Sequence, residues 1–401
     1  MDSTRRQIRE MAAGSTARSR DRQKAFEYYD FSLLAVVIVL SIFGLIMLYS
    51  TTAYSSQMAS GDDMAYLKKQ AGIDVFCLVV GIIISRMDYH LLTRFSAALY
   101  LVSLVLMALV RSPLGVESHG ARRWIGFGPL QFQPSELSKI AVIMCLSYMI
   151  VTMGKRINTR RAFLTLLGLG SVQAAGALFL TNNLSTAIII FAITAGLIFI
   201  AHPKTKPFLI ILAVVLLLAG VFIYFLYTSP ITTSSDFRLR RILVWLRPEN
   251  YASGDGYQTI QALYAIGSGG FFGRGLGNSI QKISSIPEAQ NDMIFSIICE
   301  ELGVFGAILI LALFAYLLYR LIFIAQNAPD LLGSLLVSGV FVHIALQVLM
   351  NVSVVVNLMP NTGVTLPFIS YGGTSMLFLM AEIGIALSVS RKIRFQPEQL
   401  L

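Results

Sequence analysis

Acidic side chains beside an apolar segment near residue 292 are the first candidates for proton-transfer chemistry. Asn291 can cap a helix that begins at Asp292 and runs toward Gly303, which predicts that Asp292 lies in the first turn. On that helix Asp292, Ser296 and Glu300 recur every four residues and share one face. An acidic face entering an apolar segment is costly unless it lines a polar cavity or meets a cation. The alternative for Asp292 is a first-turn acid that only interacts with the helix dipole.

A basic and glycine-rich segment lies just before these acids. Glycines allow main-chain N–H groups to approach an anion closely, and Arg and Lys add charge-assisted hydrogen bonds to phosphate. The segment matches neither the P-loop nor the dinucleotide fingerprint, so tight turns at a membrane surface are the alternative interpretation. Its basic and polar candidates are Arg238, Arg240, Arg241, Arg247, Ser279, Gln281 and Lys282.

A further charged segment follows Pro134, which ends an extended approach to an apolar run. Ser135 can cap the following helix, and Glu136 would then lie in its first turn. Lys139 lies one turn further along, at the outer edge of the membrane. We expect Lys139 either to extend its ammonium group to the lipid headgroups or to pair with an acid of the loop face.

Isolated ionisable residues interrupt other apolar runs, at Asp74, Arg320, His343 and Glu382. Arg320 and Glu382 lie near the ends of their runs or within a turn or two of them, so we expect solvation or structural pairing for them. His343 is expected to be an interior histidine with satisfied hydrogen bonds. Residues 357–375 contain two prolines and three glycines, which forbid a continuous helix. Their apolar composition predicts a segment that dips into the outer leaflet beside the site.

The composition places all of these residues in a membrane protein. Only 13% of the 401 residues are charged and 56% are hydrophobic, whereas soluble domains carry roughly 25% charged residues. Soluble enzymes and nucleic-acid-binding proteins are therefore excluded, and the net charge of +10 reports topology rather than a nucleic-acid partner. Cys77, Cys145 and Cys299 are far apart and predict neither a disulfide framework nor a metal cluster.

The predicted fold class is an all-α polytopic membrane protein with about ten transmembrane helices. A bilayer span needs roughly 20 apolar residues, and runs of that length or slightly less are distributed along the whole chain. The expected helices are 31–49, 71–85, 95–110, 137–153, 162–180, 184–201, 207–227, 304–324, 331–350 and 375–390.

The distribution of basic residues predicts the orientation. With a cytoplasmic N-terminus, 19 of the 31 Lys and Arg residues lie on the cytoplasmic side, and the even number of spans returns the C-terminus there. No cleaved signal peptide is expected, because the first apolar run is long enough to span. The expected organisation is a basic cytoplasmic tail at 1–28, a transmembrane domain at 29–395 and a cytoplasmic end at 396–401. Residues 228–303 form a large extracytoplasmic loop between the seventh and eighth helices.

Four groups of motifs, in this order along the chain, resemble the SEDS family (FtsW/RodA/SpoVE) of membrane proteins that polymerise peptidoglycan glycan strands. The resemblance covers nearly the whole chain beyond the basic tail. Its motifs are Arg123-Trp124-Ile125 with Gln133-Pro134-Ser135-Glu136; Gly256-Tyr257-Gln258 with the run ending Gln281-Lys282; Pro287-Glu288-Ala289 to Asp292 with Glu300-Glu301-Leu302-Gly303; and Leu366-Pro367-Phe368-Ile369-Ser370-Tyr371-Gly372-Gly373.

The resemblance implies a substrate, a product and roles for the candidate residues. The substrate would be lipid II, a disaccharide-pentapeptide on undecaprenyl pyrophosphate, and the product a β-1,4 glycan strand. The family's essential aspartate falls on Asp292, which would accept the proton of the acceptor C4 hydroxyl. Arg240, Arg241 and Lys282, or a divalent cation (Mg²⁺ or Mn²⁺) with Asp292 as a candidate ligand, would stabilise the leaving pyrophosphate. Other substrate-binding candidates are Gln281, Ser279, Glu300 and Lys139.

The resemblance also implies partners and a location. These are a cognate class B penicillin-binding protein, other membrane proteins of the division complex, and the bacterial plasma membrane at the division septum. Residues 129–135 and Thr365 favour the division or sporulation branch. The chain departs from the family at Asn183, where many members have Asp, and at Thr362, where some division members have Lys. A lipid II flippase and a non-catalytic component of the division complex are the rival functions.

Overall fold

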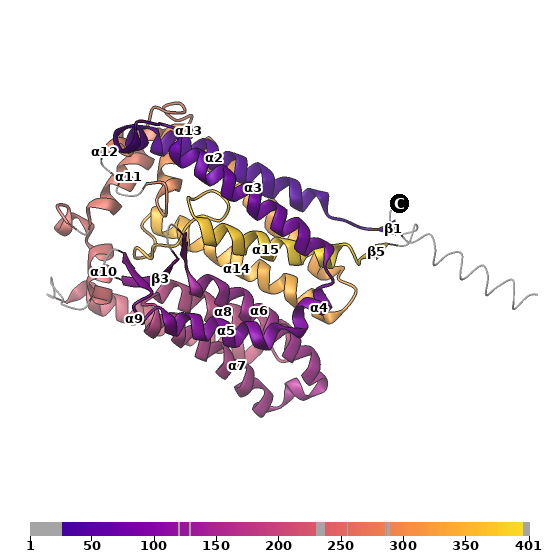
Figure 1. Ribbon diagram of the computed structural model, residues 1–401. Helices are drawn as coiled ribbons and strands as arrows, with labels where there is room; N and C mark the ends of the chain where they lie inside the picture. Colours follow the sequence, from indigo (N-terminus) through magenta and orange to yellow (C-terminus); the bar gives the residue numbers. More distant parts are fainter. Residues whose placement is uncertain are drawn as a thin grey trace, which may run out of the picture.

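A bundle of long helices forms the body of the molecule (Figure 1). The computed structural model describes residues 26–118, 121–127, 130–229, 237–254, 256–284, 286 and 289–395. The helices run along the long direction of the bundle, and the short helices and strands between them lie mainly at its two ends. The candidate residues therefore come together only where connecting segments meet at one end.

Each of the ten predicted apolar segments forms a helix. Within the described ranges, eight helices are long and apolar enough to span a membrane. Of the remaining two predicted spans, α5 has 14 residues and α3 contains four charged side chains. The ten helices are α2 (Phe31–Ser60), α3 (Ala65–Arg86), α5 (Ser96–Leu109), α6 (Pro134–Met153), α7 (Arg160–Ala175), α8 (Leu184–Ala201), α9 (Lys206–Thr228), α13 (Ile294–Gln326), α14 (Leu331–Val355) and α15 (Gly373–Ser390). A π-helical turn, Gly176–Leu180, extends α7 to the end of the predicted segment.

The two ends of the described chain meet at one end of the bundle. Strand β1 (Phe26–Glu27) pairs antiparallel with β5 (Arg394–Phe395), as Figure 1 shows. Next to them, Arg320 of α13 forms an ion pair of 2.8 Å with Asp30, which caps α2. The predicted structural pairing of Arg320 is thus confirmed. Residues 1–25 and 396–401, most of the predicted tail and the whole C-terminal end, lie outside the described residues.

Short helices complete this cytoplasmic end. Helix α4 (Tyr89–Arg94) follows α3, and the 3-10 helix Gly154–Asn158 follows α6. Asp88 caps α4 and forms ion pairs with His90 and with Lys392, which lies beside β5. These contacts join the α3–α4 connection to the C-terminal segment.

The opposite end carries structure that the sequence analysis did not predict. A three-stranded antiparallel sheet, in the order β2 (Gly115–Ser118), β3 (Ala121–Phe127) and β4 (Leu130–Phe132), stands between α5 and α6. The predicted irregular loop at 111–136 is therefore partly a sheet. The large loop at 228–303 is likewise partly helical, with α10 (Phe237–Leu246), a 3-10 helix (Pro248–Tyr251), α11 (Tyr257–Gly269) and α12 (Gln281–Ser284).

The glycine-rich run packs against a break in α13. Gly303 has φ of +70° inside this helix, and a Cβ at that position would lie 2.4 Å from both Gly273 N and Phe271 O. The N–H groups of Arg274 and Gly275 donate to the carbonyls of the two glutamates before the break, at 3.0 and 2.9 Å. These N–H groups are engaged by α13, which supports the turn interpretation of the glycines over main-chain anion binding.

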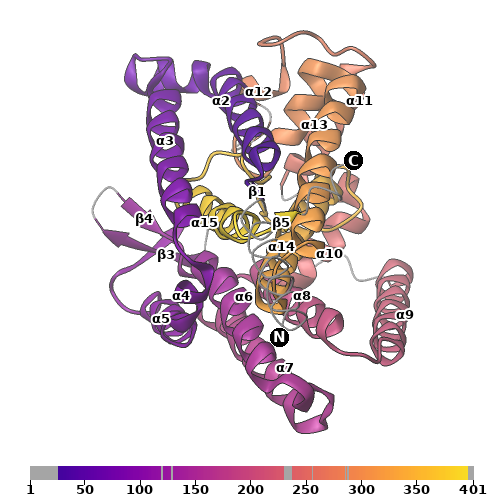
Figure 2. The same ribbon diagram turned by 90° about the vertical axis from the view of Figure 1, so that its right-hand side faces the viewer.

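Helix α9 has a different environment from the other long helices. It stands apart from the bundle (Figure 2), and only 6% of its most apolar 18-residue window is buried. Its side chains therefore face lipid on almost every side in a bilayer, which agrees with its high apolar content.

Candidate active site

The loop between α14 and α15, residues 356–372, is the centre of the outer end, and we call it the last outer loop. Helix α10 binds it twice: Arg241 Nη1 donates to Asn361 O at 3.1 Å, and Trp245 Nε1 donates to Asn357 O at 3.0 Å. Helix α11 binds it through Gln258, whose Oε1 accepts from Asn361 Nδ2 at 3.0 Å. The large loop is thereby fixed against the last outer loop.

The start of α8 binds the same loop from another side. Ser185 Oγ donates to Thr362 O at 2.7 Å. Asn183 caps α8 by accepting from Thr186 N at 3.1 Å, so it has a structural role in this chain. Residues 361 and 362 are therefore held by three different segments of the chain, which makes their main-chain position well determined.

Asp292 also lies against this loop. It is half-buried in the turn before α13, and Asn351 Nδ2 donates to its main-chain oxygen at 2.7 Å. A Cβ on the exposed residue Gly363 would lie 3.9 Å from Asp292 Oδ2. The carboxylate is thus next to residue 363, two residues from the carbonyl that Arg241 contacts.

Two details of the predicted helix start are wrong. Helix α13 begins at Ile294 with Met293 at the N-cap position, so Asn291 is not its cap and Asp292 precedes its first turn. The predicted acidic face does not form, because Asp292 is outside the helix while Ser296 and Glu300 are fully buried. Ser296 Oγ donates to Met293 O at 2.7 Å and closes the first turn instead.

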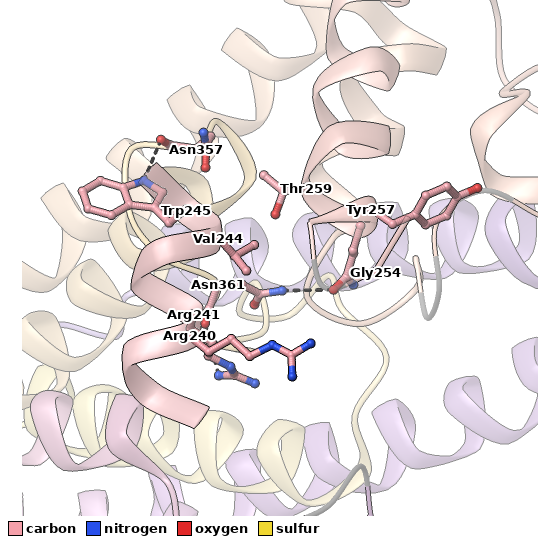
Figure 3. Close-up of a pocket in the computed structure, with 10 residues that line it drawn as sticks. Arg240, Arg241, Val244, Trp245, Gly254, Tyr257, Thr259, Asn357 and Asn361 are labelled. Atoms are coloured by element: carbon pink, nitrogen blue, oxygen red, sulfur yellow. Dashed lines mark hydrogen bonds between the residues drawn. The ribbon is translucent and has the colours of Figure 1, made fainter. Parts of the chain in front are cut away.

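A pocket of about 290 Å³ opens between α10, α11 and the last outer loop (Figure 3). Arg240 and Arg241 extend from α10 at one end of it, and Trp245 and Asn357 lie at the other. Arg240 is exposed and Arg241 is half-buried. The pocket presents two positive charges together with neutral hydrogen-bonding groups, a combination suited to a polar anionic ligand. Its lining residues are Arg240, Arg241, Val244, Trp245, Gly254, Tyr257, Gln258, Thr259, Asn357 and Asn361.

A third arginine, Arg123 of β3, lies near this pocket. Burial, and secondly the positive charge of Arg241, lower the pKa of the Arg123 guanidinium. Its Nη2 donates to Asn182 O at 3.4 Å, while its buried Nε has no hydrogen-bond partner among the described residues. Two guanidinium groups that repel one another, one with an unsatisfied nitrogen, are stabilised by an anion between them. The sequence motif Arg-Trp-Ile includes Arg123, but only the fold shows that Arg123 lies near Arg241.

The other predicted site residues of the large loop gather elsewhere. We call Ser279, Lys282, Glu300 and Glu301 the glutamate clamp, because both glutamates are fully buried and hold the glycine-rich run. Glu300 accepts from Ser279 Oγ and from Ile280 N, and it lies 3.6 Å from Arg274. Lys282 Nζ pairs with Glu301 at 2.8 Å and donates to Ser50 Oγ of α2 at 2.9 Å.

Lys282 is therefore neutralised in the structure by a buried carboxylate. Its side chain is 9% exposed, whereas that of Glu301 is fully buried. Gln281 begins α12, and its buried Oε1 has no hydrogen-bond partner among the described residues. The structure thus separates the predicted binding residues into the arginines at the last outer loop and the clamp around α12.

Lys139 lies in α6, buried rather than at the headgroups. It is 2% exposed and pairs at 2.9 Å with Glu136 of the same helix. Lys139 is therefore paired, but with an acid of α6 rather than of the loop face, and the expectation of a snorkelling side chain is wrong. Glu136 lies in the first turn of α6, as predicted, but the N-cap residue is Gln133 and no side chain caps the helix, contrary to the prediction for Ser135.

No cluster of three or more His, Cys, Asp or Glu side chains suited to a metal ion occurs among the residues that the structure describes. Mg²⁺ in enzymes is commonly held by one or two carboxylates together with substrate phosphates and water. A single carboxylate such as Asp292 is compatible with a cation of that kind, which would arrive with the substrate.

The comparisons with known proteins agree with this arrangement. The sequence model of the FtsW/RodA/SpoVE cell cycle proteins matches residues 31–394. The chain is 38% identical to stage V sporulation protein E of Bacillus subtilis (strain 168), over 91% of this chain and 98% of the relative. It is 37% identical to the probable peptidoglycan glycosyltransferase FtsW of Trichlorobacter lovleyi, over 92% and 95% of the two chains.

Solved structures show the same fold. One, described as "Structural coordination of polymerization and crosslinking by a peptidoglycan synthase complex", superposes with a TM-score of 0.75 and 27% identity, over 92% of this chain and 99% of that chain. The crystal structure of the rod shape determining protein RodA of Thermus thermophilus superposes with a TM-score of 0.63 and 27% identity, over 91% and 97% of the two chains. The chain therefore belongs to the FtsW/RodA/SpoVE family of cell cycle membrane proteins.

Proposed function

We propose that this protein is a peptidoglycan glycosyltransferase that polymerises lipid II at the outer face of the plasma membrane during septal wall synthesis. The observation that carries the proposal is that a carboxylate and an arginine lie against the last outer loop two residues apart, at Gly363 and Asn361, with a second arginine near the first. Asp292 lies beside Gly363, Arg241 binds Asn361 O, and the charge of Arg123 acts on Arg241. The nearness of a candidate proton acceptor to groups that could bind a pyrophosphate supports the proposal.

In this mechanism Asp292 is the general base. Its carboxylate accepts the proton of the C4 hydroxyl of the acceptor N-acetylglucosamine as that oxygen attacks the anomeric carbon of the donor muramyl unit. The new C1–O4 bond forms while the bond from C1 to the pyrophosphate oxygen breaks, and the electron pair leaves with undecaprenyl pyrophosphate. Attack from the side opposite the leaving group inverts C1, which gives a β-1,4 linkage from the α-linked donor.

The positive charges of the site stabilise the leaving group. Pyrophosphate gains negative charge in the transition state, and preorganised cations near it lower the barrier. Arg123, Arg240 and Arg241 supply these charges in the proposal. A divalent cation, Mg²⁺ or Mn²⁺, could be held by Asp292 and the phosphates of the substrate, and it would supply further charge neutralisation there.

Partners and location belong to the same proposal. A cognate class B penicillin-binding protein is the expected partner, which is supported by the likeness to a chain from a peptidoglycan synthase complex. The septum is the expected location, supported by the names of the FtsW relatives, while the similarity to a stage V sporulation protein supports sporulation as the second context.

Lipid II polymerisation by the purified protein tests this function. We expect strands from the wild-type protein, with or without the penicillin-binding partner, and none from the Asp292→Ala variant. Long strands from that variant would refute the assignment of Asp292. A flippase would be the better function if two results came together. The wild-type protein would make no strand with its partner present, and both the wild-type protein and the Asp292→Ala variant would scramble fluorescent lipid II in liposomes.

A further inference from the structure

A row of buried polar side chains runs along one face of α14. His343, Gln347 and Asn351 recur every four residues and share that face. Each of them is at most 2% exposed, although α14 is long and apolar enough to span a membrane. Glu382 of α15 lies against the inner end of this row, and we call the four residues the polar column.

The outer end of the polar column binds the candidate active site. Asn351 Nδ2 donates to two main-chain oxygens, that of Asp292 at 2.7 Å and that of Val364 at 2.8 Å. One turn deeper, Gln347 Nε2 donates to Thr365 O at 3.1 Å. A single amide group thus joins the segment that carries Asp292 to the last outer loop, next to residue 363.

The inner end of the column fixes the two helices that flank the last outer loop. His343 Nδ1 lies 2.7 Å from Glu382 Oε2, and both residues are 1% exposed. His343 is at the midpoint of α14, and Glu382 is at the midpoint of α15. The predicted pairing of Glu382 is confirmed, and His343 is an interior histidine as expected, although its Nε2 has no hydrogen-bond partner among the described residues.

The column is more polar than packing requires. Its members retain buried atoms without a hydrogen-bond partner among the described residues: His343 Nε2, Glu382 Oε1, Gln347 Oε1 and Asn351 Oδ1. Such atoms destabilise a protein unless internal water satisfies them. Apolar side chains of similar volume would avoid this penalty. Packing alone does not account for the polar column. Its hydrogen bonds to both the Asp292 segment and the last outer loop do account for it.

We propose that Asn351 is a positioning residue for the glycosyl transfer, held in register by Gln347 and by the His343–Glu382 pair. This inference rests on the proposed function of Asp292 as the general base. The Asn351 amide sets the distance between the Asp292 segment and the last outer loop, and with it the distance from the carboxylate to an acceptor hydroxyl. Displacement of a reacting group by about 1 Å can lower turnover about 100-fold.

The test compares variants of Asn351 by their kinetics with lipid II. Asn351→Leu removes both donors at nearly constant volume, and Asn351→Asp keeps the shape but presents an acceptor to two carbonyls. We expect both to lower kcat by about 10- to 100-fold with KM changed by less than about threefold. Asn351→Gln, which retains the donor, should recover part of kcat.

Gln173→Leu is the matched control. Gln173 is a fully buried amide of α7 that donates to Tyr100 O and to Ser103 Oγ, both at 2.8 Å, away from the last outer loop. Its loss should lower the thermal unfolding temperature as much as Asn351→Leu does, while kcat stays within about twofold of wild type. Equal loss of kcat in both variants would show only general destabilisation and would overturn the inference.

Two further results keep this inference separable from the proposed function. If Asp292→Asn is inactive but Asn351→Leu has wild-type kcat, the positioning role is refuted and the base remains. If Asp292→Asn turns over normally, the proposed function itself is refuted. Should Asn351→Leu not fold, Gln347→Leu decides in its place: it removes the Thr365 contact, and an unchanged kcat would contradict the inference.

Discussion

Two charged groups at the outer end of the bundle contrast sharply. In the glutamate clamp each buried carboxylate accepts from cations, hydroxyls or main-chain N–H groups, so charge is compensated within the protein. Beside the last outer loop, Arg241 donates to Asn361 O and Arg123 donates to Asn182 O, and the two guanidinium groups repel each other. Carboxylates and cations paired inside the protein hold a fold together, whereas guanidinium groups gathered beside a pocket are suited to bind an anionic ligand. Both groups come from sequence motifs that look equally suited to chemistry.

The contrast is tested most strongly at Asp292. Asp292→Asn removes the proposed base at constant size, and general-base catalysis typically contributes about 10²- to 10⁴-fold. We expect kcat for lipid II polymerisation to fall by that range while the thermal unfolding temperature stays the same. Asp88→Asn, at the cytoplasmic end, is the matched control and should polymerise like wild type.

A substitution in the glutamate clamp should lower the stability of the protein. Lys282→Met leaves Glu301 buried without its cation, and breaking a buried pair in this way costs about 3–5 kcal/mol. We expect a large fall in unfolding temperature, partly restored when Glu301→Gln is added. The sequence-based assignment of Lys282 to the pyrophosphate gives the opposite pattern, an unchanged unfolding temperature with a KM for lipid II raised at least tenfold.

The arginines should respond in substrate affinity. Arg123→Gln and Arg241→Gln each remove a charge-assisted hydrogen bond, worth about 1.5–3 kcal/mol, so KM for lipid II should rise about 10- to 100-fold. Because the two guanidinium groups share one anion in the proposal, the double variant should lose less than the sum of the single losses. Strict additivity of the free energies in this cycle would show that the arginines act at separate sites.

The smallest effect is expected from pH at the cytoplasmic end. The hydrogen bond from Lys392, opposed by partial burial and aided by the His90 bonds, holds the pKa of Asp88 well below its usual range. Its stabilising contribution is complete above the unfolded-state pKa, about 4, and is lost as pH falls toward the lower folded-state value. Asp88 is solvent-exposed, so the contribution is below about 1 kcal/mol. Unfolding temperatures between pH 6 and pH 3 should fall less in Asp88→Asn than in wild type.

Hydrophobic patterning predicted the helices well because each long apolar run must be buried in lipid or protein. It missed the three-stranded sheet, because residues 115–118, 121–127 and 130–132 pair through main-chain groups, and the pattern of their side chains does not indicate this pairing.

The candidate site was only partly predictable for a related reason. Asp292, Arg240 and Arg241 are close to the same loop in the structure, but Lys282 is engaged by Glu301 and Ser50, the latter more than 200 residues away in the chain. Arg123 and Asn351 were not chosen, because their roles depend on partners supplied by distant segments. A residue's type and spacing indicate what it can do, and only the fold determines which partner it meets.

The pairing of β1 with β5 brings the two ends of the described chain to neighbouring strands, which are about 4.8 Å apart in a sheet. A short peptide could therefore connect Phe395 to Phe26 without moving a helix, and the chain could be opened at a surface connection instead. Such circular permutants fold only when the new chain ends lie at connections whose main chain is neither buried nor needed for hydrogen bonds. A set of them would map, connection by connection, which turns of the bundle are simple links and which are parts of the working site.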